Sequence, residues 1–158
     1  MCLGGLSRRV RMPAVMSAGN GDFMKELEIL AVPDNLDEVL QFIDGVLEGA
    51  DCPMKTMMQI DLAVEEIFVN IASYAYQPGT GQAKIQVTVN DEPESADILF
   101  EDSGVPYNPL EKEDPDVTLS ADDRAIGGLG IYMVKKSVDE ISYERRDGKN
   151  ILTIRKYF

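Results

Sequence analysis

Histidine is absent from this chain of 158 residues. The chain therefore cannot hold a Ser-His-Asp triad or a histidine-ligated zinc, and no histidine in it can accept a phosphoryl group. Cysteine is scarce too, since Cys2 and Cys52 lie far apart and form no Cys-x-x-Cys pair. A disulfide framework is not expected, and this composition fits a reducing compartment and hence a cytoplasmic location.

Basic residues and long apolar runs are also scarce. The 15 Lys and Arg stand against 28 Asp and Glu, which gives a net charge of -13. Such a surface repels nucleic acid and anionic membranes, so we expect neither as a partner and expect instead a protein with a basic patch. No apolar run approaches the roughly 20 residues that span a bilayer. An anionic ligand would need a metal ion, backbone N–H groups or a helix N-terminus to hold it.

The first 23 residues differ in composition from the rest of the chain. They are rich in glycine, carry Arg8, Arg9 and Arg11, and show no hydrophobic period. Their apolar stretch is interrupted by Pro13 and is too short for a signal peptide. We expect residues 1–23 to be a disordered extension, or an over-long start with Met24 as the natural first residue. Residues 24–158 then form one domain, with enough of the chain's 44% hydrophobic residues to bury a core.

Hydrophobic periodicity predicts alternating groups of strands and helices. The predicted strands are 25–32, 84–91, 96–102, 141–146 and 150–158, and the predicted helices are 34–49, 53–76 and 131–139. Residues 94–97 are predicted as a turn, Asp147-Gly148 as a hairpin turn, and 105–126 as a long loop of the kind that usually has a function. This order predicts an α+β two-layer sandwich, with helices packed on one face of a mixed, mostly antiparallel sheet.

Glu66 and Asn70 are the first candidate site, on the second predicted helix. They are four residues apart and so lie roughly 40° apart on one face, which Ser73 and Gln77 extend. A carboxylate can activate a hydroxyl or a water, and an asparagine carbonyl can bind Mg²⁺. Glu65 points elsewhere and is the weaker candidate. A solvated helix face would give the same pattern.

Asp102-Ser103-Gly104 is the second candidate, at the end of a predicted strand. The aspartate can accept a hydrogen bond from an amine such as that of adenine. The glycine lets the backbone approach a flat ring closely. An ordinary Asx turn would show the same three residues.

Gly127-Gly128-Leu129-Gly130 is the third candidate, directly before a predicted helix. The free N–H groups and the positive dipole end of that helix can hold phosphates, although a flexible hinge would look alike. Rossmann and P-loop sites need a glycine loop directly after a strand, and a P-loop also needs Gly-Lys-Ser/Thr. This chain has neither arrangement.

Together these motifs resemble a known family. EEIFVNIASYAY is similar to the N box of the histidine-kinase-like (GHKL, Bergerat-type) ATPases, DSGVP to their first glycine box, and GGLGIYMVKK to their second. The resemblance covers about residues 24–158 and is nearest to the anti-sigma-factor serine/threonine kinases. It implies the Bergerat ATP-binding fold, with ATP and Mg²⁺ as cofactors.

The resemblance also implies roles for individual residues. Glu66 matches the general base, Asn70 the Mg²⁺ ligand, and Asp102 the residue that binds the adenine amine, with Gly104 beside the ring. The phosphates are expected at an ATP lid of about residues 108–128 that ends in the second glycine box. Gly128 and Gly130 match the phosphate-binding glycines at the edge of the lid. Ser73, Arg124, Gly127 and Leu129 are further expected contacts of the nucleotide.

The family's partners would be a STAS-type anti-sigma-factor antagonist, as the kinase substrate, and a sigma factor; a homodimer is also expected. The chain departs from the pattern in three places. Ser73 stands where many relatives have histidine, Pro106 replaces a glycine, and the lid reads ADDRAI, in which Arg124 is the obvious cation. One alternative is therefore an ATP-dependent binding module that transfers no phosphate. Half of a split histidine kinase and a domain that binds no nucleotide are further alternatives.

Overall fold

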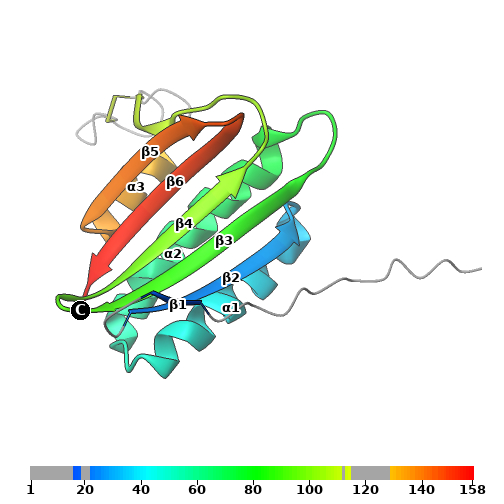
Figure 1. The fold of residues 1–158 in the computed structure, drawn as a ribbon. Coiled ribbons are helices and arrows are strands. Elements are labelled where there is room, and N and C mark those ends of the chain that lie inside the picture. The colour runs from blue at the N-terminus through cyan, green and yellow to red at the C-terminus, as the bar shows by residue number, and fades with distance from the viewer. Residues whose placement is uncertain (1–15, 19–21, 112, 115–128) are drawn as a thin grey trace, which may run out of the picture.

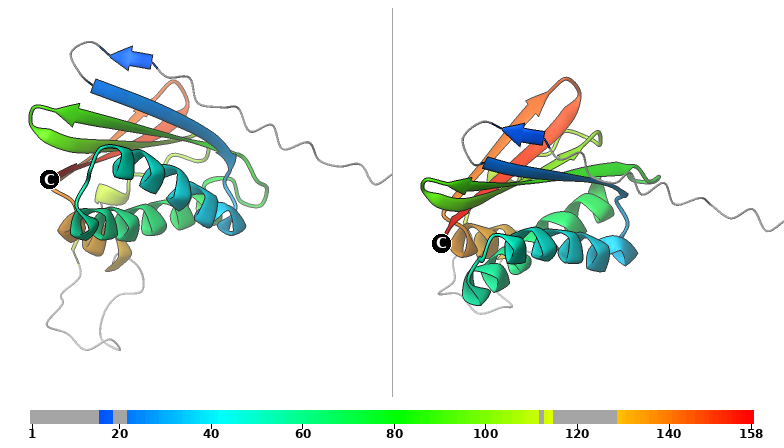
Figure 2. Two further views of the ribbon diagram at one scale, coloured as in Figure 1. Left: turned by 90° about the horizontal axis from the view of Figure 1, so that it is seen from below. Right: turned by 60° about the horizontal axis from the view of Figure 1, so that its bottom comes forward.

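The computed structural model describes residues 16–18, 22–111, 113–114 and 129–158. They form a six-stranded sheet in the order β1-β2-β3-β4-β6-β5, and helices cover one of its faces (Figures 1 and 2). The strands are β1 Met16–Ala18, β2 Asp22–Leu30, β3 Gln82–Asp91, β4 Glu94–Asp102, β5 Glu140–Arg146 and β6 Lys149–Tyr157; the helices are α1 Leu36–Gly49, α2 Met54–Asn70 and α3 Leu129–Ser137. The predicted α+β sandwich is confirmed.

Alternation along the strands decides which face the helices cover. On β3, every second residue from Ala83 to Val89 is buried, and the residues between them are partly exposed. A period of two places the buried side chains on one face of the sheet. They meet a helical stripe on α2 that includes Ile60, Val64 and Phe68, all buried. The core therefore lies between the sheet and the helices, and the other face of the sheet carries polar residues.

The described strand pairs are all antiparallel, so the mixed character that the prediction allowed is not seen among them. The turn predicted at 94–97 is wrong, because the chain turns at Glu92-Pro93 and β4 already begins at Glu94. Proline lacks the N–H that a strand ladder needs and favours turns. Ser95, which lies within the predicted turn, is instead a buried residue of β4. It accepts a hydrogen bond from Asn90, its partner across the strands.

The prediction of an unstructured stretch through residue 23 needs a correction. Met16–Ala18 forms β1 and pairs with β2, and β2 begins at Asp22 rather than at Lys25. The reason is that Phe23 and Met24 continue the ladder with β3, opposite Val89 and Thr88. Residues 1–15 and 19–21 lie outside the described residues. None of the described helices has the length and apolar character that a membrane span requires.

Asp61 on α2 and Asp44 on α1 bring two carboxyl groups together between these helices. One oxygen of each group is buried without a hydrogen-bond partner among the described residues. Burial, together with the neighbouring carboxyl group of Asp44, raises the pKa of Asp61 to about 6, from 3.8. The folded chain therefore binds a proton more tightly than the unfolded chain. The free energy of unfolding should fall as pH rises from about 4 to 6 and stay low above that range.

Replacing Asp61 with asparagine should remove this pH dependence. We expect Asp61→Asn to stabilise the fold at pH 7 by about 1 kcal/mol, a modest value because water partly screens a half-buried carboxyl. Urea unfolding at pH 4.5 and 7.5 measures both quantities. Glu65→Gln, at an exposed position on the same helix, is the control and should change neither. An unchanged pH profile in Asp61→Asn would show that this carboxyl pair does not govern stability.

Candidate functional site

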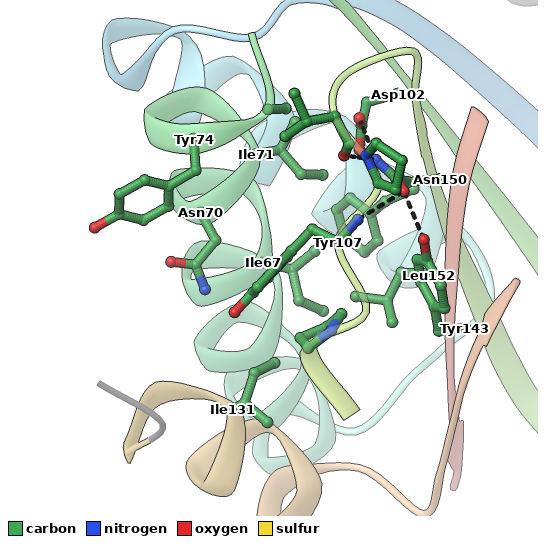
Figure 3. A pocket seen from close by; sticks show the side chains of 15 residues that line it. Ile67, Asn70, Ile71, Tyr74, Asp102, Tyr107, Ile131, Tyr143, Asn150 and Leu152 are labelled. Carbon is green, nitrogen blue, oxygen red and sulfur yellow. Dashed lines mark hydrogen bonds between the residues drawn. The ribbon is translucent and has the colours of Figure 1, made fainter. Parts of the chain in front are cut away.

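A pocket of about 140 Å³ opens where α2 passes the segment that follows β4 (Figure 3). Whole drug-sized ligands usually occupy roughly 300 Å³ or more, so this pocket suits one ring system with the rest of a ligand outside. Its walls are mainly apolar, with a few polar groups among them. The lining residues are Ile67, Asn70, Ile71, Tyr74, Ala75, Phe100, Asp102, Val105, Pro106, Tyr107, Pro109, Ile131, Tyr143, Asn150 and Leu152.

Asp102 is the buried acceptor of this pocket. It is the last residue of β4, and only 6% of its surface is exposed. Its Oδ1 atom accepts hydrogen bonds from the Gly104 backbone N–H and from Asn150 Nδ2, each at 2.9 Å. No described residue donates to Oδ2. The carboxylate is therefore fixed through one oxygen, and its other oxygen can accept a hydrogen bond from a ligand amine.

Asn150 holds this arrangement together, although it belongs to none of the three sequence motifs. Its amide nitrogen donates to Asp102 Oδ1 and to the Val105 carbonyl at 2.8 Å, and its oxygen accepts from the Tyr143 hydroxyl at 2.6 Å and the Tyr107 N–H at 3.3 Å. Figure 3 shows Asn150 between Asp102 and the two tyrosines. Both donors and both acceptor positions of the amide are thus used. The side chain ties β4, β5 and the loop after β4 to β6.

The register of the β4–β6 pair would have identified Asn150 as a residue of the site. It lies directly opposite Asp102 in the β4–β6 pair, one residue after the start of β6. An asparagine facing the core at a strand end is a buried polar group that needs partners. The sequence alone did not give that register, so the residue was missed.

Gly104 lies where the backbone must approach the helical segment that follows α2. The Val105 N–H donates to the Ala75 carbonyl at 2.9 Å, and a Cβ atom at position 104 would overlap the backbone carbonyl of Ala75. Only glycine fits without a shift of the main chain. Position 104 therefore requires a glycine because of the helical segment at Ala75, and the predicted approach of its backbone to a ligand ring stays a prediction.

Replacing Gly104 with alanine should disturb both the fold and the pocket. Because the obstacle is backbone rather than a flexible side chain, we expect Gly104→Ala to cost roughly 1–3 kcal/mol of stability and to weaken ligand binding in the pocket. Thermal unfolding and calorimetry with ATP measure the two effects. Gly45→Ala on α1 is the matched control, since a Cβ there meets nothing within 4 Å; it should not lower stability. Equal melting temperatures for Gly104→Ala and wild type would contradict the steric argument.

Glu66 and Asn70 do lie together, as predicted. Asn70 Nδ2 donates to Glu66 Oε1 at 3.3 Å. Asn70 lines the pocket, but Glu66 is half-buried one turn away and does not line it. A Cβ atom on Gly130, the second residue of α3, would overlap the Glu66 carboxylate. The carboxylate therefore lies at the amino end of α3, where the helix dipole favours an anion.

Ser73, which was predicted to share the face of Asn70, does not line the pocket. The reason is that α2 ends at Asn70 and continues as a π-helical segment, Ile71–Ala75, which has more residues per turn than an α-helix. Ile71, Tyr74 and Ala75 line the pocket in its place. Ser73 only accepts a bond from Gln77 Nε2 at its backbone oxygen, at 2.7 Å.

The second glycine box is described only in part. Arg124, Gly127 and Gly128 lie outside the described residues, so their predicted roles remain predictions. Leu129 and Gly130 begin α3, as a glycine-box-to-helix junction requires. The fold thus brings Asn70 and Asp102 to one pocket and places Gly104, Glu66 and Gly130 beside it.

Comparison with known proteins gives the family. A model of the histidine kinase-like ATPase domain matches residues 29–156. The chain belongs to this family. This histidine kinase-like ATPase domain is similar to the serine/threonine-protein kinase BtrW of Bordetella bronchiseptica, with 27% identity over 81% of this chain and 89% of the relative. It is 24% identical to the serine-protein kinase RsbW of Bacillus subtilis, over 84% of each chain.

Solved structures agree on the fold of this histidine kinase-like ATPase domain. A chain in the SiaB-SiaC complex from Pseudomonas aeruginosa has a TM-score of 0.54 at 15% identity, over 84% of this chain and 89% of that chain. Both curated relatives are named protein kinases, which confirms the resemblance seen in the motifs. The family also implies the use of ATP.

Proposed function

We propose that the chain is an ATP-binding serine/threonine protein kinase of the anti-sigma-factor type. The observation that carries the proposal is the state of Asp102, which is buried, fixed through one oxygen and without a described donor on the other. Adenine offers an exocyclic amine to such an acceptor and a flat apolar ring to the walls of the pocket. The relatives named as serine and serine/threonine kinases support the same reading.

Asn70 would orient the phosphate end of the nucleotide, because it lines the pocket on the side of Glu66 and α3. A bound Mg²⁺ would neutralise phosphate charge, and Asn70 Oδ1 is an oxygen donor of the kind that it accepts. The described residues include no group of three or more acidic, Cys or His side chains that could hold a metal ion by themselves. This fits Mg²⁺, which usually takes one or two protein ligands and the phosphates of the nucleotide.

Glu66 would act as the general base, accepting the proton of a Ser or Thr hydroxyl on the substrate protein. It is one helical turn from Asn70 and lies at the amino end of α3. Gly127 and Gly128, with Arg124, would face the phosphates from the lid. The substrate would be a STAS-type antagonist, the protein held in exchange a sigma factor, and the acting form a homodimer.

A binding module without phosphoryl transfer is the second candidate. The position of Glu66 favours it, because the carboxylate packs under Gly130 and accepts the Asn70 amide instead of lining the pocket. In that state the carboxylate is not presented to an incoming hydroxyl. The chain would then sequester a partner in an ATP-dependent way and transfer no phosphoryl group.

Radiolabel transfer separates the two candidates. The purified chain is incubated with γ-³²P-ATP, Mg²⁺ and a purified STAS-type antagonist, and label on the antagonist is followed with time. Label on the wild-type antagonist, and none on an antagonist whose acceptor serine is alanine, is the result expected of the kinase. ATP binding by calorimetry without any label transfer would establish the binding module. Absence of ATP binding would remove both candidates.

A further inference from the structure

The outer face of α2 carries a line of large apolar side chains. Met54, Met58 and Leu62 recur every four residues and are 68%, 65% and 45% exposed, while Ile60 and Val64 on the inner face are buried. Such a spacing forms an i, i+4, i+8 ridge, roughly 12 Å long. Single exposed apolar residues are ordinary, but a contiguous row on a solvent-facing helix marks a contact surface. The residues Met54, Met58 and Leu62 are called the α2 ridge below.

The segment that contains α1 and α2 has an excess of acidic residues. Residues 33–70, which contain α1 and α2, hold nine acidic residues and a single cation, Lys55. Residues 129–158 hold seven Lys and Arg against four Asp and Glu, and two of these cations, Lys135 and Lys136, lie on α3, which packs against α2. Residues 33–70 thus contribute a net charge of -8 (nine acidic residues less one cation), and residues 71–114, with nine acidic residues and two Lys, contribute a further -7. A partner at the ridge must tolerate this potential, and a cationic partner gains from it.

We propose that the α2 ridge is the docking site for a basic amphipathic helix of another protein. A ridge of i, i+4 spacing packs into the groove between the corresponding rows of a second helix. Methionine side chains adapt to different apolar partners. Lysine and arginine on the flanks of the incoming helix would meet the acidic residues of α1 and α2. This inference uses no property of the nucleotide site.

Other occupants fit the charge and pattern less well. A second copy of the chain would bring an equally acidic α1–α2 face against the first. Residues 115–128 carry three aspartates and one arginine, so they share the sign of this face. Residues 1–15 are basic, but Gly4, Gly5 and Pro13 interrupt any helical apolar stripe in them. A separate basic helix meets both requirements.

The test uses a fluorescent peptide of about 18 residues, five helical turns, made only of leucine and lysine with the leucines on one face. Anisotropy of this probe is followed with the full chain at moderate salt. The triple variant Met54→Gln/Met58→Gln/Leu62→Gln keeps the charge of the protein and favours helix. It should weaken probe binding about tenfold or more. Leu30→Gln is the matched control, since Leu30 is an exposed leucine on β2, and it should bind like wild type.

Three results would overturn the proposal. The first is equal probe affinity for the triple variant and wild type, or no probe binding by either protein. Unchanged melting temperatures would show that both proteins are folded in this case. The second is tighter probe binding by a chain that lacks residues 1–15. That result would show that residues 1–15 compete with the probe and occupy the ridge themselves. The third is loss of self-association in the triple variant, which would assign it to a second copy. Calorimetry with ATP on the triple variant should be unchanged, so failure of the nucleotide proposal and failure of this one are separable.

Discussion

Replacing Glu66 with glutamine is expected to slow phosphoryl transfer by roughly 10²–10⁴-fold and to leave ATP affinity within a few-fold of wild type. Glutamine keeps the size of the side chain, and its oxygen can still accept the Asn70 amide, so the local contact survives. It cannot, however, accept a proton. The measurement is single-turnover label transfer to the antagonist, with calorimetry for ATP binding.

Glu65→Gln is the control for this experiment, because Glu65 is exposed on the same helix and outside the pocket. It should transfer label at the wild-type rate. If Glu66→Gln does so instead, the assignment of the base to Glu66 fails and Glu65 becomes the candidate. Circular dichroism of each variant excludes a shared folding defect.

Asn70→Ala, unlike Glu66→Gln, should change the affinity for ATP. Asn70 lines the pocket and is the candidate metal ligand, so its loss should weaken Mg²⁺-dependent ATP binding more than metal-free binding. Calorimetry with ATP in the presence of Mg²⁺ and of a chelator gives the two affinities. An equal loss under both conditions would show that Asn70 acts on the nucleotide directly and not through a metal ion.

Asp102→Asn should lower ATP affinity about 10–150-fold, the effect of losing a charge-assisted buried hydrogen bond worth about 1.5–3 kcal/mol. The hydrogen bonds to Asp102 determine the orientation of the new amide group. The Gly104 N–H and Asn150 Nδ2 both donate to Oδ1, so the oxygen of the new amide must stay there. Its NH₂ group then replaces Oδ2 and faces the adenine amine, donor against donor.

Inosine triphosphate provides the matched ligand, because it carries a carbonyl oxygen where adenine has the amine. Wild type should prefer ATP, and Asp102→Asn should lose or reverse that preference, since its NH₂ can donate to the carbonyl. Calorimetry with both nucleotides on both proteins completes the cycle. Equal ATP affinity in the two proteins would remove Asp102 from the site.

Much of the fold follows from patterns within single segments. Ile131 and Val134 of α3, and Val138 directly after it, are buried as their spacing predicts. The hairpin turn at Asp147-Gly148 adopts the positive φ values of 52° and 76° that such a two-residue turn needs. Segments of this kind are predictable because their signal lies in neighbouring residues.

The parts that were missed depend on contacts between distant segments. Asn150 acquires its role only because β6 pairs with β4 in a register that places it opposite Asp102. Ser73 lies outside the pocket because the helix changes its period after Asn70, and no residue type in the sequence IASYA indicates that change. The site was therefore predictable as a set of motifs, but not as a network of hydrogen bonds.

The π-helical segment, Ile71–Ala75, makes the pocket depend on the number of residues in the chain and not only on their identity. It adds a residue to the turn and so sets the direction of the Ala75 carbonyl, which accepts the Val105 N–H and meets Gly104. A one-residue deletion there would restore the α-helical period and rotate that carbonyl away, without removing a pocket side chain. Insertions and deletions between Asn70 and Gly81 are thus a route by which related chains could lose or reshape this pocket while keeping Asn70, Asp102 and Gly104.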